Sequence, residues 1–270
     1  MALITEYKQE KRYEKWILAA VLISAMGASS VQAKEWKEVR FGIEGAYPPF
    51  SWTEPNGELK GFDVDMANAL CAQMQVKCKI VAQDWDGIIP SLLARKYDAI
   101  IAAMSITEER KKKIDFTGKY ALIPNKFVAK KGTDLDFTKE GLKGVKIGVQ
   151  RATTHDKYLT DNFGDSVEIV RYGSFDDAYL DLKAGRIVSV LGDASALEEG
   201  LLNKDGGDGF EFIGPSLTDP KWFGDGFGIA VRKQDKDLTK KLDEAILALR
   251  ENGQYQKIAE KYFNYDVYGK

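Results

Sequence analysis

Polar groups suited to a carboxylate gather in residues 97–117, YDAIIAAMSITEERKKKIDFT. The apolar run 99–104 breaks into Ser105-Ile106-Thr107, and Arg110 opens the charged segment that follows. A buried strand that passes straight into a helix start would bring hydroxyls, free backbone N–H groups and a guanidinium to one strand tip. A helix N-terminus favours negative charge, and arginine offers a planar two-pronged donor. The spacing alone is equally compatible with an ordinary turn that precedes a solvated basic helix.

Apolar runs that alternate with amphipathic helical patterns would position these groups. The predicted strands are residues 39–43, 78–82, 99–104, 126–130, 145–149, 167–170, 187–191 and 227–231. The predicted helices are residues 62–74, 88–94, 156–162, 175–184, 238–250 and 254–263. This alternation predicts an α/β fold with mostly parallel sheets. In such sheets, ligands bind beyond the carboxyl ends of the strands, where the strand order reverses.

The first 33 residues have the features of a signal peptide. An apolar stretch of residues 16–28 follows a basic region that carries Lys8, Lys11, Arg12 and Lys15. The small-x-small sequence Val31-Gln32-Ala33 predicts cleavage before Lys34. The apolar stretch is shorter than the roughly 20 residues of a membrane span. An uncleaved anchor is the alternative.

The remaining chain has a mild charge and a length that allows a large core. Removing 33 of 270 residues leaves 237, with 35 of the 39 Lys and Arg and 38 of the 41 Asp and Glu, a net charge of −3. This value argues against nucleic acid or a polyanionic surface as a partner. The length suits one large domain or two lobes.

The two cysteines, Cys71 and Cys78, lie in one short segment, LCAQMQVKC. In an exported protein this spacing predicts one local disulfide that joins a helix end to the next strand. A pair of free buried thiols is the alternative. We expect no metal site, because the chain has only two thiols and one histidine, His155. We also expect no cofactor.

Several ordered motifs resemble those of the periplasmic binding proteins for polar amino acids, the soluble receptors of amino-acid ABC importers. These motifs are GIEGAYPPF at 42–50, GFDVD at 61–65, WDGIIP at 85–90, the D-A…S-I-T-x2-R pattern of 98–110, FGDG at 223–226 and KYF at 261–263. The resemblance runs from about Lys34 to the C-terminus. It is closest to the branch that binds lysine, arginine, ornithine, histidine or arginine-derived opines.

The resemblance implies a two-lobed fold of the type II periplasmic binding proteins, with two hinge crossings in extended conformation. After the signal peptide of residues 1–33, lobe 1 would comprise residues 34–121 and 224–270, and lobe 2 residues 126–217. The hinges would be residues 122–125 and 218–223.

The resemblance also assigns the groups that hold the ligand's backbone end. Arg110 matches the arginine that clamps the α-carboxylate, with Ser105 assisting, and Asp193 matches the acid that accepts from the α-ammonium. The same implied site includes Ala103, Met104, Thr153 and Thr154. Helix capping is the alternative role for Asp193 and for the two threonines.

Glu44, Tyr47 and Trp85 match the side-chain end of the site, where two aromatic walls and an acid suit a guanidinium or ammonium. An exposed strand-end acid is the alternative for Glu44. Ala102-Ala103 replaces a Ser-Ser pair that is common in relatives, so the pocket floor is less polar and leaves room for a bulkier guanidino compound or opine. For His155 we expect a position on the surface at a helix start; a contact with the ligand's side chain is the alternative.

The resemblance therefore implies a monomeric periplasmic receptor that captures a cationic L-amino acid by cleft closure. Such a receptor delivers its ligand to a membrane permease with ATPase subunits. Two alternatives share the fold: a dehydratase-like enzyme and a chemosensory receptor. The sequence contains no nucleophile–base pair of the kinds that mark hydrolytic enzymes.

Overall fold

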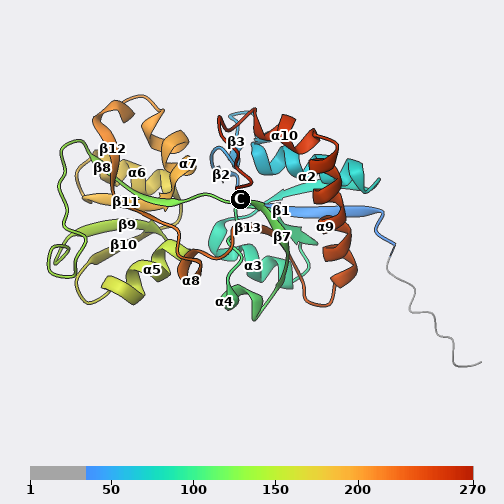
Figure 1. Ribbon diagram of the computed structural model, residues 1–270, viewed down its shortest axis with the longest axis horizontal. Coiled ribbons are helices and arrows are strands. Elements are labelled where there is room, and N and C mark those ends of the chain that lie inside the picture. The colour runs from blue at the N-terminus through green and yellow to red at the C-terminus, as the bar shows by residue number, and fades with distance from the viewer. Residues whose placement is uncertain (1–34, 270) are drawn as a thin grey trace, which may run out of the picture. The chain divides into compact units, whose positions relative to one another are not determined.

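Two five-stranded sheets organise residues 35–269, the part of the chain that the computed structural model describes (Figure 1). The predicted signal peptide, residues 1–33, lies outside the described residues. The first sheet has the strand order β5 (Lys77–Ala82), β1 (Glu38–Ile43), β6 (Ala99–Ile100), β13 (Phe227–Val231) and β7 (Asp115–Ala121). The second has the order β10 (Glu168–Tyr172), β9 (Lys146–Gln150), β11 (Ser189–Asp193), β8 (Asn125–Lys130) and β12 (Phe210–Leu217).

Each sheet is mostly parallel. Only β13 in the first sheet and β8 in the second run against the other four strands. The predicted α/β fold with mostly parallel sheets is therefore confirmed. A small antiparallel sheet of β2 (Ala46–Tyr47), β3 (Ser51–Thr53) and β4 (Leu59–Lys60) accompanies the first.

Helices cover both faces of the first sheet, on the right in Figure 1. On one face, α2 (Phe62–Gln73), α9 (Lys236–Glu251) and α10 (Gln254–Ala259) share a core with Phe41. On the other, α3 (Trp85–Leu93) packs around Ile100. The buried residues of α9 recur three or four apart and form one apolar stripe: Leu238, Leu242, Ala245, Ile246 and Leu249.

The second sheet is covered in the same way. The helix α5 (Thr154–Phe163) packs on one face with Ile147, and α6 (Phe175–Lys183) and α7 (Ala194–Leu197) pack on the other with Val190. The short elements that complete the fold are α4 (Glu108–Lys111), the π-helix η1 (Glu198–Leu202), the 3-10 helix η2 (Gly207–Gly209) and α8 (Pro220–Phe223).

The strand order reverses once in each sheet. The chain leaves β1 for β5 on one side and then places β6 on the other side of β1. It likewise leaves β9 for β10 and then returns to place β11 on the opposite side of β9. Ligand sites of open α/β sheets form at such reversals, so a ligand site is expected at the ends of β1, β6, β9 and β11.

The chain passes between the sheets twice, after β7 and after β12 (Figure 1). The second crossing differs from the extended segment that we expected, because it contains the single-turn helix α8. Asp219 precedes Pro220, and its Oδ1 accepts a hydrogen bond from Lys221 N at 2.9 Å. An acidic N-cap followed by proline at the first helical position favours a helix start.

The predicted strand at residues 99–104 is wrong beyond Ile100. Ala103 has a positive φ of 45°, and its N–H donates to Asp63 Oδ2 at 2.9 Å and to Tyr120 Oη at 3.0 Å. These side chains replace the strand's ladder partners, so the backbone turns toward the site. Strands β7 and β12 escaped prediction because neither is a continuous apolar run; β12 contains Gly214 and Pro215.

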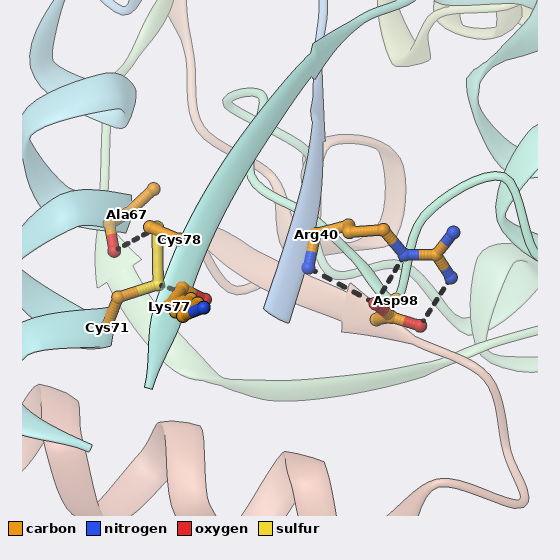
Figure 2. Close-up of a disulfide and its surroundings, with 6 residues drawn as sticks. All are labelled: Arg40, Ala67, Cys71, Lys77, Cys78 and Asp98. Carbon is orange, nitrogen blue, oxygen red and sulfur yellow. Dashed lines mark hydrogen bonds and ion pairs between the residues drawn. A yellow bond between two sulfur atoms is a disulfide. The ribbon is translucent and has the colours of Figure 1, made fainter. Parts of the chain in front are cut away.

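The predicted disulfide between Cys71 and Cys78 is confirmed, with 5.6 Å between the two Cα atoms. It ties the end of α2 to β5 (Figure 2). Figure 2 also shows the Arg40 guanidinium against Asp98, with Nε and Nη2 each 2.9 Å from a carboxylate oxygen. Both contacts fix the packing of the first sheet.

Candidate functional site

A pocket with about 300 Å³ of atom-free space lies where the ends of β1, β6, β9 and β11 approach one another. Both sheets contribute side chains to its wall. The lining residues are Glu44, Tyr47, Trp85, Ala102, Ala103, Ser105, Arg110, Gln150, Thr153, Thr154, His155, Phe175 and Asp193.

Arg110 is the cationic group of the pocket. Thr107 caps the short helix α4 by accepting a hydrogen bond from Arg110 N at 3.3 Å. The guanidinium donates through Nη1 to Ser105 O at 3.0 Å and lies 5.2 Å from the centre of the Trp85 ring. Burial lowers the pKa of Arg110 to about 10, and Asp193 opposes this shift. The side chain is therefore charged at neutral pH, with donors left for a carboxylate.

Asp193 is the acid that faces this charge from the second sheet. It ends β11, is 5% exposed, and accepts a hydrogen bond from Tyr47 Oη at 2.5 Å. Burial raises the pKa of its carboxyl to about 7, while the Tyr47 hydrogen bond and the charge of Arg110 lower it. Asp193 occupies the N-cap position of α7 but makes no side-chain capping bond. A cationic ligand group would favour its ionised form.

Thr153 and Thr154 lie at the N-terminus of α5 and line the pocket. Thr153 Oγ1 accepts from Asp156 N at 3.2 Å, and its hydroxyl donates to Gln150 O at 2.7 Å. Thr153 therefore does cap the helix, as the alternative reading held, and capping also places it against the pocket.

Glu44 and two aromatic rings form another part of the wall. Glu44 is half-buried and accepts from Gln150 Nε2 at 2.5 Å. Burial raises the pKa of its carboxyl to about 7, and the Gln150 hydrogen bond opposes this shift. Trp85 Nε1 donates to Ala152 O at 3.2 Å, and the Tyr47 ring centre lies 5.3 Å from that of Phe175. An acid beside π faces is an environment suited to an organic cation.

Nine of the ten predicted ligand residues line the pocket, and Met104 does not. Met104 is fully buried in the apolar cluster between the first sheet and α3, which also contains Ile88 and Leu92. The strand end turns at Ala103, so the neighbouring Ala103 and Ser105 lie at the pocket instead of Met104.

The structure adds three residues that the sequence reasoning did not place in the site. The expectation of a surface position for His155 is wrong: it is 3% exposed, and its Nε2 lies 2.7 Å from Asn125 Oδ1. Burial lowers the pKa of His155 to about 3, and the charge of Arg110 adds to the shift. Gln150 ends an apolar strand as Asp193 does, a signal that could have marked it. Phe175 carried no comparable signal.

The described residues show neither a metal site nor a membrane helix. No group of three or more His, Cys, Asp or Glu side chains within residues 35–269 is arranged to hold a metal ion. In the same part of the chain, every helix is too short or too polar to cross a bilayer.

Comparisons with known proteins agree with this geometry. Residues 39–265 match the profile of the bacterial extracellular solute-binding proteins, family 3. The chain is 50% identical to an L-arginine-binding protein of Pseudomonas aeruginosa over 94% of its length and 97% of the relative. It is 42% identical to ABC transporter arginine-binding protein 1 of Escherichia coli, with 93% and 99% covered. A solved Salmonella typhimurium periplasmic binding protein with high arginine specificity superposes with a TM-score of 0.78 at 33% identity, covering 84% of this chain and 100% of that one.

Proposed function

Because this chain belongs to the bacterial extracellular solute-binding proteins of family 3, we propose that it captures a cationic L-amino acid in the periplasm for an ABC importer. The ligand would be of the arginine, ornithine, lysine or histidine type. Arginine itself is favoured, because the relatives described above are arginine-binding proteins.

The observation that carries this proposal is the charge pattern of the pocket. Arg110, Asp193 and Glu44 line the same cavity. A free amino acid with a basic side chain carries one anionic group and two cationic groups. Burial of each would be costly without an oppositely charged partner. Arg110 would neutralise the α-carboxylate, Asp193 the α-ammonium, and Glu44 the side-chain cation.

Ligand capture would proceed by closure of two lobes without a chemical step. We propose lobe 1 as residues 34–121 and 224–270, lobe 2 as 126–217, and hinges at 122–125 and 218–223. Arg151 Nε lies 2.6 Å from Asp86 Oδ2, and Lys157 Nζ lies 3.7 Å from Glu109 Oε2; both ion pairs would join the lobes at the rim of the site. A ligand that binds both lobes increases the population of the closed state.

The energies are sufficient for tight binding. Hydrogen bonds to charged groups contribute roughly 1.5–3 kcal/mol each. Three such contacts, reduced by the cost of ordering and closure, are compatible with micromolar binding, about −8 kcal/mol. The closed receptor, as a monomer, would then dock on a permease with its ATPase subunits.

A bulkier guanidino compound or opine is the second candidate ligand. Ala102 and Ala103 at the pocket wall favour it, because small apolar side chains leave room where hydroxyls are common in relatives. The cationic amino acid and the bulkier candidate differ in the substituent at the ligand's α-position. Binding assays with compounds that differ only there would distinguish them.

Calorimetry on the mature chain, unfolded and refolded to remove bound ligand, tests the proposal. We expect micromolar or tighter binding of arginine, weaker binding of neutral amino acids, and recovery of the ligand unchanged. Opines and polyamines belong in the same panel. Absence of binding by every cationic amino acid would refute the proposed ligand class, and turnover of the ligand would refute a purely binding role.

A further inference from the structure

We propose that Gln150 is a positioning residue that holds Glu44 across the site and makes the closed pocket selective for a guanidinium over an ammonium group. This inference rests on the proposed binding of a cationic amino acid. Gln150 would act in two ways. It would hold the Glu44 carboxylate in place, and it would itself accept a hydrogen bond from the ligand.

The side-chain amide of Gln150 has two fixed partners. Gln150 ends β9 and is 2% exposed. Its Nε2 donates to Gly173 O at 3.1 Å and to Glu44 Oε1 at 2.5 Å. Gly173 directly follows β10, which pairs with β9, so this partner belongs to the same sheet. Both amide hydrogens are thus engaged, which fixes the plane and the direction of the amide.

The second partner comes from the other sheet. Glu44 directly follows β1, so the bond from Gln150 joins the first sheet to the second across the pocket. It occupies Oε1 of the carboxylate and leaves Oε2 for a ligand. Gln150 itself retains its Oε1, which can only accept. The closed site therefore offers two acceptors of fixed direction, one from each sheet.

Two fixed acceptors suit a guanidinium better than an ammonium. Guanidinium carries five N–H donors in one rigid plane, so one ligand group can donate to Glu44 and to Gln150 together. An ammonium is a compact charge with three rotatable donors, and it gains less from a fixed pair of acceptors.

Gln150 also acts on the ionisation of Glu44. The charged and titratable groups near this carboxyl are Asp84, Asp86, Asp176, Tyr47 and Arg151, which is bonded to Asp86. The three aspartates and burial disfavour its ionised form, whereas the Gln150 amide favours it. Loss of the amide should therefore weaken cation binding most at low pH.

The test compares the purified wild-type protein with Gln150→Leu by calorimetry at pH 6 and pH 8. The probes are arginine, lysine and the uncharged arginine analogue citrulline. We expect Gln150→Leu to lower arginine affinity about ten- to a hundredfold, the range of one hydrogen bond to a charged group. Lysine affinity should fall less, and the loss for arginine should be larger at pH 6. Gln150→Asn keeps the amide but is one carbon shorter, so it should not reach Glu44 and should give the same result. It replaces the leucine variant if that variant does not fold.

Glu44→Gln provides the control for the positioning role. In a Glu44→Gln background, Gln150→Leu should lower arginine affinity clearly less than it does in the wild type, because only the direct contact of Gln150 with the guanidinium remains to be lost. Additive losses, or equal losses for arginine and lysine, would overturn the inference while leaving the proposed function intact. If the wild-type protein binds no cationic amino acid, the proposed function fails first.

Discussion

Asp193→Asn should make the unliganded protein more stable at neutral pH while it removes amino-acid binding. Asp193 is buried, and the pKa of its carboxyl is raised from 3.8 to about 7, chiefly by desolvation. The folded state therefore favours the neutral form. The contribution of Asp193 to stability is full below pH 3.8 and decreases as the pH rises toward 7.

The size of this effect follows from the shift. Each pKa unit corresponds to about 1.36 kcal/mol, so the rise from 3.8 to about 7 amounts to about 4 kcal/mol above pH 7. Asparagine resembles the neutral acid in shape and can still accept from the Tyr47 hydroxyl. Asp193→Asn should therefore raise the free energy of unfolding by up to about 4 kcal/mol at pH 8 and leave it nearly unchanged near pH 4.

Urea unfolding of ligand-free protein at a series of pH values from 4 to 8 measures this difference. Asp208→Asn, at an exposed acid, is the matched control and should leave stability nearly unchanged at every pH. Equal unfolding free energies for the Asp193→Asn variant and the wild type at pH 8 would refute the claim that the carboxyl is desolvated without a ligand. Retained arginine affinity in the variant would separately refute its role as the partner of the α-ammonium.

Three further predictions concern the other parts of the site and the fold. Arg110→Ala should abolish binding of every amino acid while near-UV circular dichroism stays native, and calorimetry with unchanged affinity would contradict its role. Trp85→Leu should weaken arginine binding by about 0.5–2 kcal/mol, the range of a cation–π contact, with less effect on neutral ligands; an equal loss for both would remove the aromatic wall from the selectivity argument. Replacing Cys71 and Cys78 by serine should lower the free energy of unfolding by about 2–3 kcal/mol without changing ligand affinity, since the loop is short and distant from the site; a denaturant titration that shows no change would reject this.

Most strands and helices were predictable because their signals are local. The apolar run of β1, the stripe of α9 and the alternation of strands with helices all follow from short stretches of sequence. The same reasoning failed at residues 101–104, where Asp63 and Tyr120 supply hydrogen bonds from distant positions. No local pattern contains such partners, so the sequence predicts a longer strand than the structure has.

The site could be predicted in part for the same reason. Polar residues at strand ends, such as Glu44 and Asp193, are visible as interruptions of apolar runs. The burial of His155 depends instead on Asn125 and on the packing of Phe175 and Phe223 around its ring. These contacts join segments up to 68 residues apart in sequence, from 155 to 223, and no short motif records them.

The position of β13 has a consequence for how the chain assembles. This strand lies between β6 and β7 in the first sheet, yet its residues, Phe227–Val231, come after the whole of the second sheet. A nascent or truncated chain that stops before residue 227 contains every strand of the second sheet but only disconnected parts of the first. Synthesis from the N-terminus should thus complete the second sheet before the first, and the first sheet should form fully only after residues 227–270 have joined it.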